Sequence, residues 1–193
     1  MKPLVSIFAL AALAFADPSP DKSVGSKTAP TLIDIFLDFQ CPPCKMFHDQ
    51  TLPDVISNYA DKGKVFIVYH DLPLPMHNHA LEAARWANAA NSVHKYKEVS
   101  NKLFETQTQW AATGDIRAVI ASVLSPADLK TTEAHLKDPS IEAGIDKDRQ
   151  LAVQAQVKQT PTIVVTHKLQ NYPFGGFVSY SILKQALDDI AKK

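Results

Sequence analysis

Cys41 and Cys44 are the only cysteines in this chain, and they stand where one periodic pattern gives way to another. The preceding stretch TLIDIFLDF is β-prone and has apolar residues on both faces, which is typical of a strand buried inside a sheet. After Cys41 the spacing becomes helical, with one stripe formed by Cys44, Phe47, His48 and Leu52. The sequence therefore predicts a strand that runs directly into a Cys-x-x-Cys helix start.

This position has a chemical consequence for a thiol. A helix N-terminus offers unpaired N–H groups and a partial positive charge, both of which stabilise a thiolate. We expect Cys41, at the exposed N-terminal edge, to be the nucleophile, and Cys44, one turn further in, to be more buried and to resolve a mixed disulfide. Pro43 falls in the first turn, where its missing N–H costs little, whereas Pro42 restricts the loop without donating to the sulfur.

A metal site or a structural disulfide would also use two nearby cysteines. Zinc or copper takes about four ligands, and Cys41, Cys44 and His48 supply three at most. A bridge between residues three apart closes a very short loop and removes little entropy from the unfolded chain. A redox-active dithiol is therefore the favoured interpretation, with the metal site and the structural bridge as alternatives.

The N-terminal 16 residues have the three regions of a secretory signal: a basic start at Lys2, a short apolar run, and Ala14-Phe15-Ala16. We expect cleavage after Ala16, where these regions end, with a buried N-terminal helix as the alternative. The apolar run is shorter than the ~20 residues of a membrane-spanning helix. Residues 17–30 are rich in Pro, Ser and Lys, which predicts a flexible segment. The mature protein should then be periplasmic or otherwise extracytoplasmic, where disulfides persist.

The remainder predicts one α/β domain over residues 31–193. KVFIVYHDLPL indicates a second strand, and about 77–157 carries only amphipathic helical patterns. PTIVVTH is a third strand, followed by a hairpin partner near residues 172–174 and a terminal helix. We expect helix caps at Asp115, Ser125, Ser140 and Ser179, and an interruption of the first helix at Pro53.

Charge and the remaining motifs point to no other chemistry. Lys plus Arg and Asp plus Glu are both 20, so there is no electrostatic reason to expect nucleic acid or an anionic membrane as partner. HNH at 77–79 lacks a surrounding metal-binding hairpin and is interpreted as a helix cap. His48 is interpreted as a surface residue of its helix, and Trp86 and Trp110 as packing residues of the helical block.

Three segments resemble those of DsbA-type thiol–disulfide oxidoreductases, which have a thioredoxin fold. DFQCPPCKMFH resembles the active-site segment, QTPTIVV at 159–165 the cis-proline loop, and FVSYSILKQALD the terminal helix. The resemblance covers nearly all of the chain after Pro30. It implies an α/β, thioredoxin-like fold with a central mixed β-sheet and a helical insertion between the second strand and the cis-Pro strand.

The resemblance also implies site roles, beginning with Cys41 as nucleophile and Cys44 as resolving thiol. Pro161 would follow a cis peptide bond and face the disulfide, and the backbone at Thr160 would pair with an extended substrate segment. Asp38 matches the family pattern and is a candidate proton relay.

Two positions depart from the family. Pro43 stands where many relatives have a His or Tyr, and a histidine there would help stabilise the thiolate. Ile35 stands where relatives often carry an acid that accepts a proton near the buried thiol. We therefore group Pro42, Pro43 and Asp38 as residues that modulate the dithiol.

The predicted function is an exported oxidase that introduces disulfides into reduced or unfolded exported proteins. No organic cofactor or metal is expected beyond the Cys41–Cys44 disulfide. A membrane quinone-linked partner, DsbB-like or VKOR-like, would reoxidise the pair, and the protein is expected to be a monomer. The same cysteines would serve a reductase or isomerase, and a non-catalytic metal-binding thioredoxin-like module is a further alternative.

Overall fold

The computed structural model describes residues 20–192, and the predicted signal peptide and residues 17–19 lie outside them. A five-stranded sheet has the order β1-β3-β2-β4-β5. Its strands are β1 (Ser23–Gly25), β2 (Thr31–Leu37), β3 (Val65–Asp71), β4 (Thr162–His167) and β5 (Gln170–Gly175). Only β2 and β3 pair in parallel, and the other three pairs are antiparallel. The predicted mixed sheet, with the strand before the cysteines at its centre, is confirmed.

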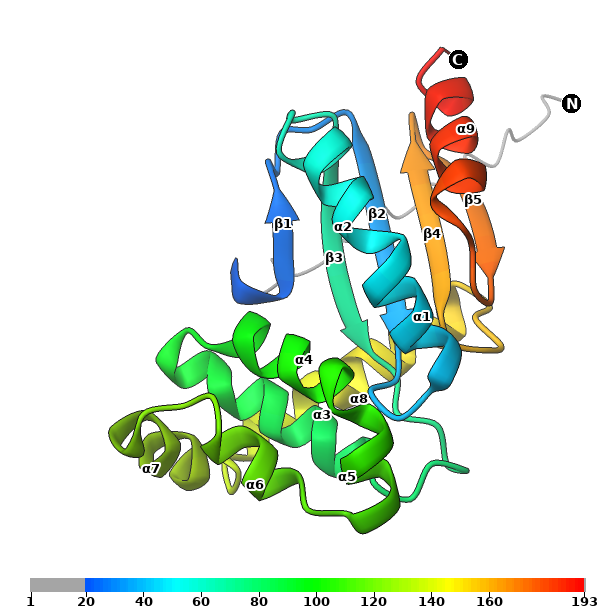
Figure 1. Ribbon diagram of the computed structural model, residues 1–193. Helices are drawn as coiled ribbons and strands as arrows, with labels where there is room; N and C mark the ends of the chain where they lie inside the picture. The colour runs from blue at the N-terminus through cyan, green and yellow to red at the C-terminus, as the bar shows by residue number, and fades with distance from the viewer. Residues whose placement is uncertain (1–19, 193) are drawn as a thin grey trace, which may run out of the picture.

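Helices α1 (Pro42–Gln50), α2 (Leu52–Val55) and α9 (Tyr180–Ile190) lie against one face of the sheet (Figure 1). The first helix stops at Thr51, before Pro53, and the chain then continues through α2 and a π-helical turn at Ile56–Ala60. This interruption was expected, because proline cannot donate within a continuous helix. The arrangement places the N-terminus of α1 at the end of central strand β2, where the cysteines are.

The helical insertion between β3 and β4 is also confirmed, and it forms a separate layer at one end of the sheet (Figure 1). Trp86 and Trp110 are buried within it, as predicted for packing residues. Its helices are α3 (Ala80–Ala89), α4 (Tyr96–Glu105), α5 (Gln107–Thr113), α6 (Ile116–Ala121), α7 (Pro126–His135) and α8 (Pro139–Gln154). Within the described chain, no helix has the length and apolar character needed to cross a membrane.

Capping follows the expectations in two helices and departs from them in two. Asp115 and Ser125 accept hydrogen bonds from the first turns of α6 and α7. Helix α8 is capped by Asp138, which accepts from the Ser140 amide, so it begins earlier than the predicted cap at Ser140. Ser179 occupies the N-cap position of α9, but its side chain makes no capping hydrogen bond.

The N-terminal segment differs most from its prediction. From Pro20 onward it is ordered, with a short 3₁₀ turn at Pro20–Lys22 followed by strand β1 on the edge of β3. Lys22 is buried, and its ammonium lies 2.7 Å from Asp71 and 2.8 Å from Asp148. The prediction of a flexible segment is therefore wrong for residues 20–25, because two buried acids far along the chain fix a lysine that composition alone marks as solvated.

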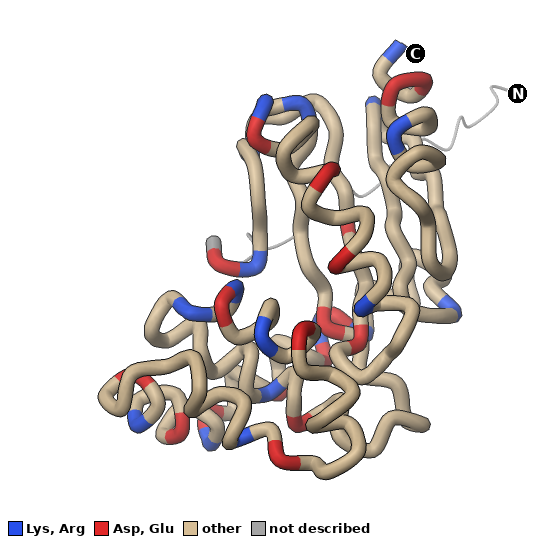
Figure 2. The backbone as a smooth tube through the Cα atoms, in the orientation of Figure 1, with Lys and Arg blue, Asp and Glu red and all other residues tan. Residues whose placement is uncertain are grey.

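Lys and Arg positions are interspersed with Asp and Glu positions along the backbone, and neither sign gathers in a single region in this view (Figure 2). This distribution agrees with the zero net charge of the sequence. One group of charged residues is internal. It is a cluster, termed here the buried ion cluster, formed by Lys22, Asp34, His70, Asp71, Asn88 and Asp148.

Candidate active site: the dithiol and the cis-proline loop

Cys41 is the N-cap residue of α1, with extended backbone angles of φ −77° and ψ 119°. Pro42 and Pro43 fill the first two helical positions, as predicted, so neither removes a hydrogen bond from inside the helix. Cys44 follows them, and its amide is the first of the helix that can donate; it lies 3.1 Å from the Cys41 carbonyl oxygen. Because the two prolines have no N–H, Cys44 is the first residue of the helix that can donate a hydrogen bond to the Cys41 sulfur.

Both cysteines are free thiols, and both are buried, with exposed fractions of 5% for Cys41 and 2% for Cys44. The prediction that Cys41 lies at an exposed edge is wrong. Gln107 of α5 donates from Nε2 to the carbonyl oxygens of Phe39 and Cys41, at 2.7 and 3.0 Å. The insertion thereby closes over the loop before α1, which pattern reasoning on the two cysteines alone does not reveal.

The two thiols nevertheless differ strongly in acidity. A hydrogen bond from the Cys44 thiol, with contributions from Thr160 and the Cys44 amide, lowers the pKa of Cys41 to about 6 despite burial. Burial, followed by the hydrogen bond to Cys41 and the charge of Cys41, raises the pKa of Cys44 well above its usual value. Near neutral pH the pair therefore holds one thiolate, on Cys41, and one proton, on Cys44.

The cis-proline loop lies against Cys41. The Thr160–Pro161 peptide bond is cis, as predicted, and β4 begins at the next residue. When protonated, the Cys41 thiol donates to the Thr160 carbonyl oxygen at 3.3 Å. The Pro161 carbonyl accepts from the Gly176 amide at 2.7 Å, which fixes the loop to the end of β5. Two motifs that are far apart in the sequence predicted four site residues, and the structure brings them together: Cys41, Cys44, Thr160 and Pro161.

Asp38 lies beside the dithiol, but its carboxylate is occupied elsewhere. Its Oδ1 accepts from the Gln40 amide at 2.7 Å, and its Oδ2 accepts from the Leu74 amide at 2.8 Å and from His77 Nδ1 at 2.7 Å. Its contacts with the dithiol are through the backbone: its N–H donates to Cys44 Sγ at 3.4 Å, and its carbonyl oxygen accepts from the Cys41 amide at 3.1 Å. Asp38 therefore ties the cysteine loop to the connection after β3, and a proton-relay role for it stays a prediction.

Two residues of this network escaped the sequence analysis. His77 contacts the Asp38 carboxylate instead of capping a helix, and the N-cap residue of α3 is His79, whose side chain makes no capping bond. Gln107 holds the loop before Cys41 from 66 residues away in sequence. Neither has a local signal, because a histidine in a loop and a glutamine at a helix start are ordinary surface patterns.

His48 contacts neither thiol. Its Nδ1 lies 2.8 Å from Asp49, its Nε2 lies 3.0 Å from Asn101 of α4, and its ring stacks on Phe104. It is thus a bridge between α1 and the insertion, which is more than the surface position that we predicted. Among residues 20–192, no three side chains of His, Cys, Asp or Glu are grouped so that they could hold a metal ion.

Comparison with known proteins places this geometry in a family. Residues 19–189 match the Thioredoxin family. A Bacillus cereus protein named probable disulfide bond formation protein D is 25% identical over 91% of this chain and 81% of its own length. Disulfide bond formation protein D of Bacillus subtilis is 24% identical over 86% of this chain and 74% of its own length.

Among solved structures, α-DsbA1 of Wolbachia pipientis superposes with a TM-score of 0.73 at 20% identity, covering 89% of this chain and 90% of that one. That likeness establishes the shared fold, including the helical insertion. With the Cys-x-x-Cys at the start of α1 and the cis-proline beside it, the family match shows that this chain belongs to the thioredoxin family, as a DsbA-type protein thiol–disulfide oxidoreductase.

Proposed function

We propose that this protein is an exported dithiol oxidase that introduces disulfide bonds into reduced or unfolded extracytoplasmic proteins. The observation that carries the proposal is the split between the two thiols, with the pKa of Cys41 lowered to about 6 and that of Cys44 raised. A thiol of low pKa is a good leaving group in disulfide exchange. In the mixed disulfide the substrate is bonded to Cys41. Because Cys41 is a good leaving group, the step that releases the substrate in its oxidised form is favoured.

The reaction begins from the Cys41–Cys44 disulfide. A substrate thiolate attacks Cys41 Sγ, a mixed disulfide forms, and Cys44 leaves and takes a proton, in agreement with its raised pKa. A second substrate thiolate then attacks the substrate sulfur of the mixed disulfide, and Cys41 leaves as a thiolate. Two electrons pass from the substrate to the enzyme, and two substrate thiols become one disulfide.

The cis-proline loop supplies a place for the substrate backbone. The Thr160 carbonyl oxygen is 3.3 Å from Cys41 Sγ, so an extended segment that paired with the backbone there would bring its own cysteine to Cys41. Pro161 fixes that edge of the loop. Recognition through the backbone would be tolerant of substrate sequence, as a general oxidase requires.

The cycle needs an acceptor for the two electrons that remain on Cys41 and Cys44. We assign this role to a membrane quinone-linked reoxidase of the DsbB-like or VKOR-like kind. Removal of residues 1–16 as a signal peptide would deliver a monomer to the periplasm or another extracytoplasmic space. The dithiol itself is the only redox group that this cycle uses.

The reduction potential of the Cys41–Cys44 pair, measured by equilibration with glutathione, tests the direction of electron flow. The reduction potential is about −270 mV for thioredoxin and about −120 mV for DsbA, and their nucleophilic cysteines have pKa values of about 7 and about 3.5. A Cys41 pKa of about 6 predicts a potential between these limits and net oxidation of a reduced model protein. A potential at or below that of thioredoxin, without net oxidation, would reassign the protein as a reductase.

Two further outcomes would point elsewhere. Rearrangement of a scrambled protein without net oxidation would indicate an isomerase. Stoichiometric zinc or copper bound through Cys41 and Cys44 in the purified reduced protein would indicate a metal-binding module. The matched control for each assay is Cys41→Ser, which should abolish exchange because it removes the attacked sulfur.

A further inference from the structure

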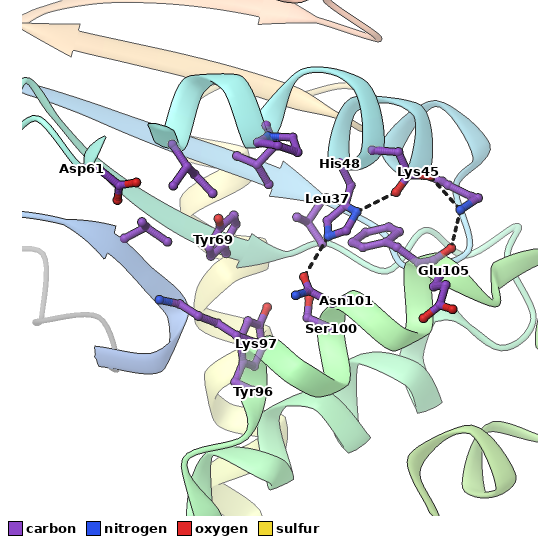
Figure 3. A pocket seen from close by; sticks show the side chains of 16 residues that line it. Leu37, Lys45, His48, Asp61, Tyr69, Tyr96, Lys97, Ser100, Asn101 and Glu105 are labelled. Atoms are coloured by element: carbon purple, nitrogen blue, oxygen red, sulfur yellow. Dashed lines mark hydrogen bonds and ion pairs between the residues drawn. The ribbon is translucent and has the colours of Figure 1, made fainter. Parts of the chain in front are cut away.

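A groove of about 910 Å³ separates α1 and α2 from helix α4 of the insertion (Figure 3). Its volume lies within the roughly 300–1,000 Å³ of small-molecule sites. Leu37 of β2 and Tyr69 of β3 contribute from the sheet, and the apolar part of the remaining lining includes Leu52, Ile56 and Phe104. Neither cysteine nor the cis-proline loop lines it, so this groove is distinct from the site of disulfide exchange.

One end of the groove is bridged by polar groups that already have partners. Lys45 Nζ donates to the Phe104 carbonyl oxygen at 2.8 Å and pairs with Asp49 at 2.8 Å, and His48 reaches Asn101 (Figure 3). These contacts join α1 to α4 and leave little capacity for a ligand. Any polar recognition must therefore come from the middle and the opposite end of the groove.

The middle of the groove contains a largely buried tyrosine whose hydroxyl has no partner within the described chain. Tyr69 is 9% exposed, lies between α4 and the helices above it, and makes no hydrogen bond to any other residue of the described chain (Figure 3). Burial raises the pKa of Tyr69, so the hydroxyl stays protonated and can donate. A ligand that supplied an acceptor here would gain a hydrogen bond in a largely apolar surrounding.

Two further donors come from the same face of α4. Lys97 extends across the open end of the groove and forms no ion pair within residues 20–192, and Ser100 lies one turn further along (Figure 3). Asp61 stands at that end on the opposite wall and likewise has no ion-pair partner among the described residues. An ammonium and two hydroxyls in a groove with an apolar part are complementary to an anionic, acceptor-rich group attached to an apolar body.

We propose that this groove binds a single-chain amphiphile with a carboxylate head, such as a free fatty acid. The chain lies along Leu52, Ile56 and Phe104, where its burial supplies affinity. The carboxylate lies where Lys97, Ser100 and Tyr69 can donate to it. Asp61 repels the same carboxylate, so the two unpaired charges at the open end have opposite effects on affinity.

The test titrates the reduced full chain with decanoate below its micelle concentration and follows binding by calorimetry. One-to-one binding is expected, with decanol weaker and decyltrimethylammonium weaker still. Lys97→Gln should weaken decanoate binding about five- to tenfold and leave decanol unchanged, because it removes one charge-assisted hydrogen bond. Asp61→Asn should tighten decanoate binding about twofold, and Tyr69→Phe should weaken both decanoate and decanol about threefold or more.

Lys95→Gln is the matched control, because Lys95 is the N-cap residue of α4, lies outside the groove and pairs with Glu98, which does not line it either. It should leave decanoate affinity unchanged. The absence of saturable binding would overturn the proposal, as would equal binding of the cationic amphiphile or unchanged affinity in both Lys97→Gln and Asp61→Asn. Displacement of decanoate by a reduced cysteine peptide would also overturn it, by placing the ligand at the dithiol. Because the readout is binding, its failure is separable from any failure of the oxidase assay.

Discussion

The dithiol and the buried ion cluster are two sets of buried polar groups on the same strands and the loops that follow them. They differ in their partners: the cluster pairs opposite charges, whereas the dithiol has neutral hydrogen-bond donors. In the cluster, Lys22 contacts two carboxylates, and His70 contacts Asp148 and Asp34 at 2.9 and 2.8 Å. At the dithiol, the groups that stabilise the Cys41 thiolate are the Cys44 thiol, Thr160 and the Cys44 amide, none of which is charged. The cluster is thus held in one charge state, whereas the dithiol can change its charge and its bonding.

This difference separates stability from reactivity. When one member of a buried ion pair is removed, the other charge stays buried without compensation, and the free energy of unfolding falls. Because Cys41 has no charged partner, it can act as a nucleophile or as a leaving group in disulfide exchange, and it can gain a proton near neutral pH. Changes to the cluster should therefore alter folding and spare exchange chemistry, and changes to the dithiol should do the reverse.

The largest effect is expected for Lys22→Met, which leaves Asp71 and Asp148 buried without their cation. We expect a loss of about 3–5 kcal/mol in the free energy of unfolding, measured by urea denaturation, since breaking a buried pair strands a charge. Lys27→Met is the control on the same segment. A loss below about 1 kcal/mol would show that the cluster does not determine stability.

The next effect concerns Cys44→Ala, which removes the main hydrogen-bond donor to Cys41. The pKa of Cys41 should rise from about 6 by about one to two units, which corresponds to a charge-assisted hydrogen bond of roughly 1.5–3 kcal/mol. The ultraviolet absorbance of the thiolate reports the titration. An unchanged pKa would assign the acidity to Thr160 and the Cys44 amide instead.

The pH dependence of stability should differ between the two regions. Burial would lower the pKa of His70, but hydrogen bonds and charges from Asp148 and Asp34 raise it to about 9. Its contribution, of order 3 kcal/mol, is complete below the unfolded pKa of about 6.5 and is lost as pH rises through about 9. His70→Gln should remove that dependence in both the reduced and the oxidised protein.

Cys41 has the opposite sign, because its pKa is lowered to about 6 in the folded state. Its contribution is complete above the unfolded thiol pKa of about 8.5 and is lost as pH falls through about 6. Only the reduced protein has this titration. Denaturation of both redox forms across this range should show the reduced form losing stability relative to the oxidised one as the pH falls, and parallel curves would contradict the assignment.

The smallest effect is expected for Asp38→Asn. The negative charge of Asp38 is a minor factor that raises the pKa of Cys41, so its removal should lower that pKa by a few tenths of a unit. Thiolate titration measures this, with Asp49→Asn as the control at an exposed acid. A large loss of exchange rate without a change in this pKa would instead favour the proton-relay role that the sequence suggested.

Local patterns predicted the parts of the molecule whose causes are local. The buried strand, the Cys-x-x-Cys helix start, the prolines in the first turn and the proline before β4 each depend on neighbouring residues, and each was found as expected. The helical insertion followed from the absence of strand signals over about 77–157. These features define the fold and bring Cys41 to Thr160.

The features that escaped prediction have distant causes. Strand β1 exists because Lys22 meets acids on β3 and α8, and the cysteines are covered because Gln107 reaches back to the loop before α1. The Asp38–His77 pair joins two loops that follow different strands. Residue spacing within one helix or one strand does not predict contacts between residues that are distant in the sequence.

The place of Lys22 near the start of the chain also bears on when the fold can be completed. Its two carboxylate partners follow 49 and 126 residues later, and the second lies on α8, close to the end of the insertion. A chain made from its N-terminus must therefore carry this lysine without its second carboxylate until most of the sequence has emerged. The first residues that the structure describes are therefore among the last to be fixed in place, and β1 completes the edge of a sheet whose centre can assemble without it.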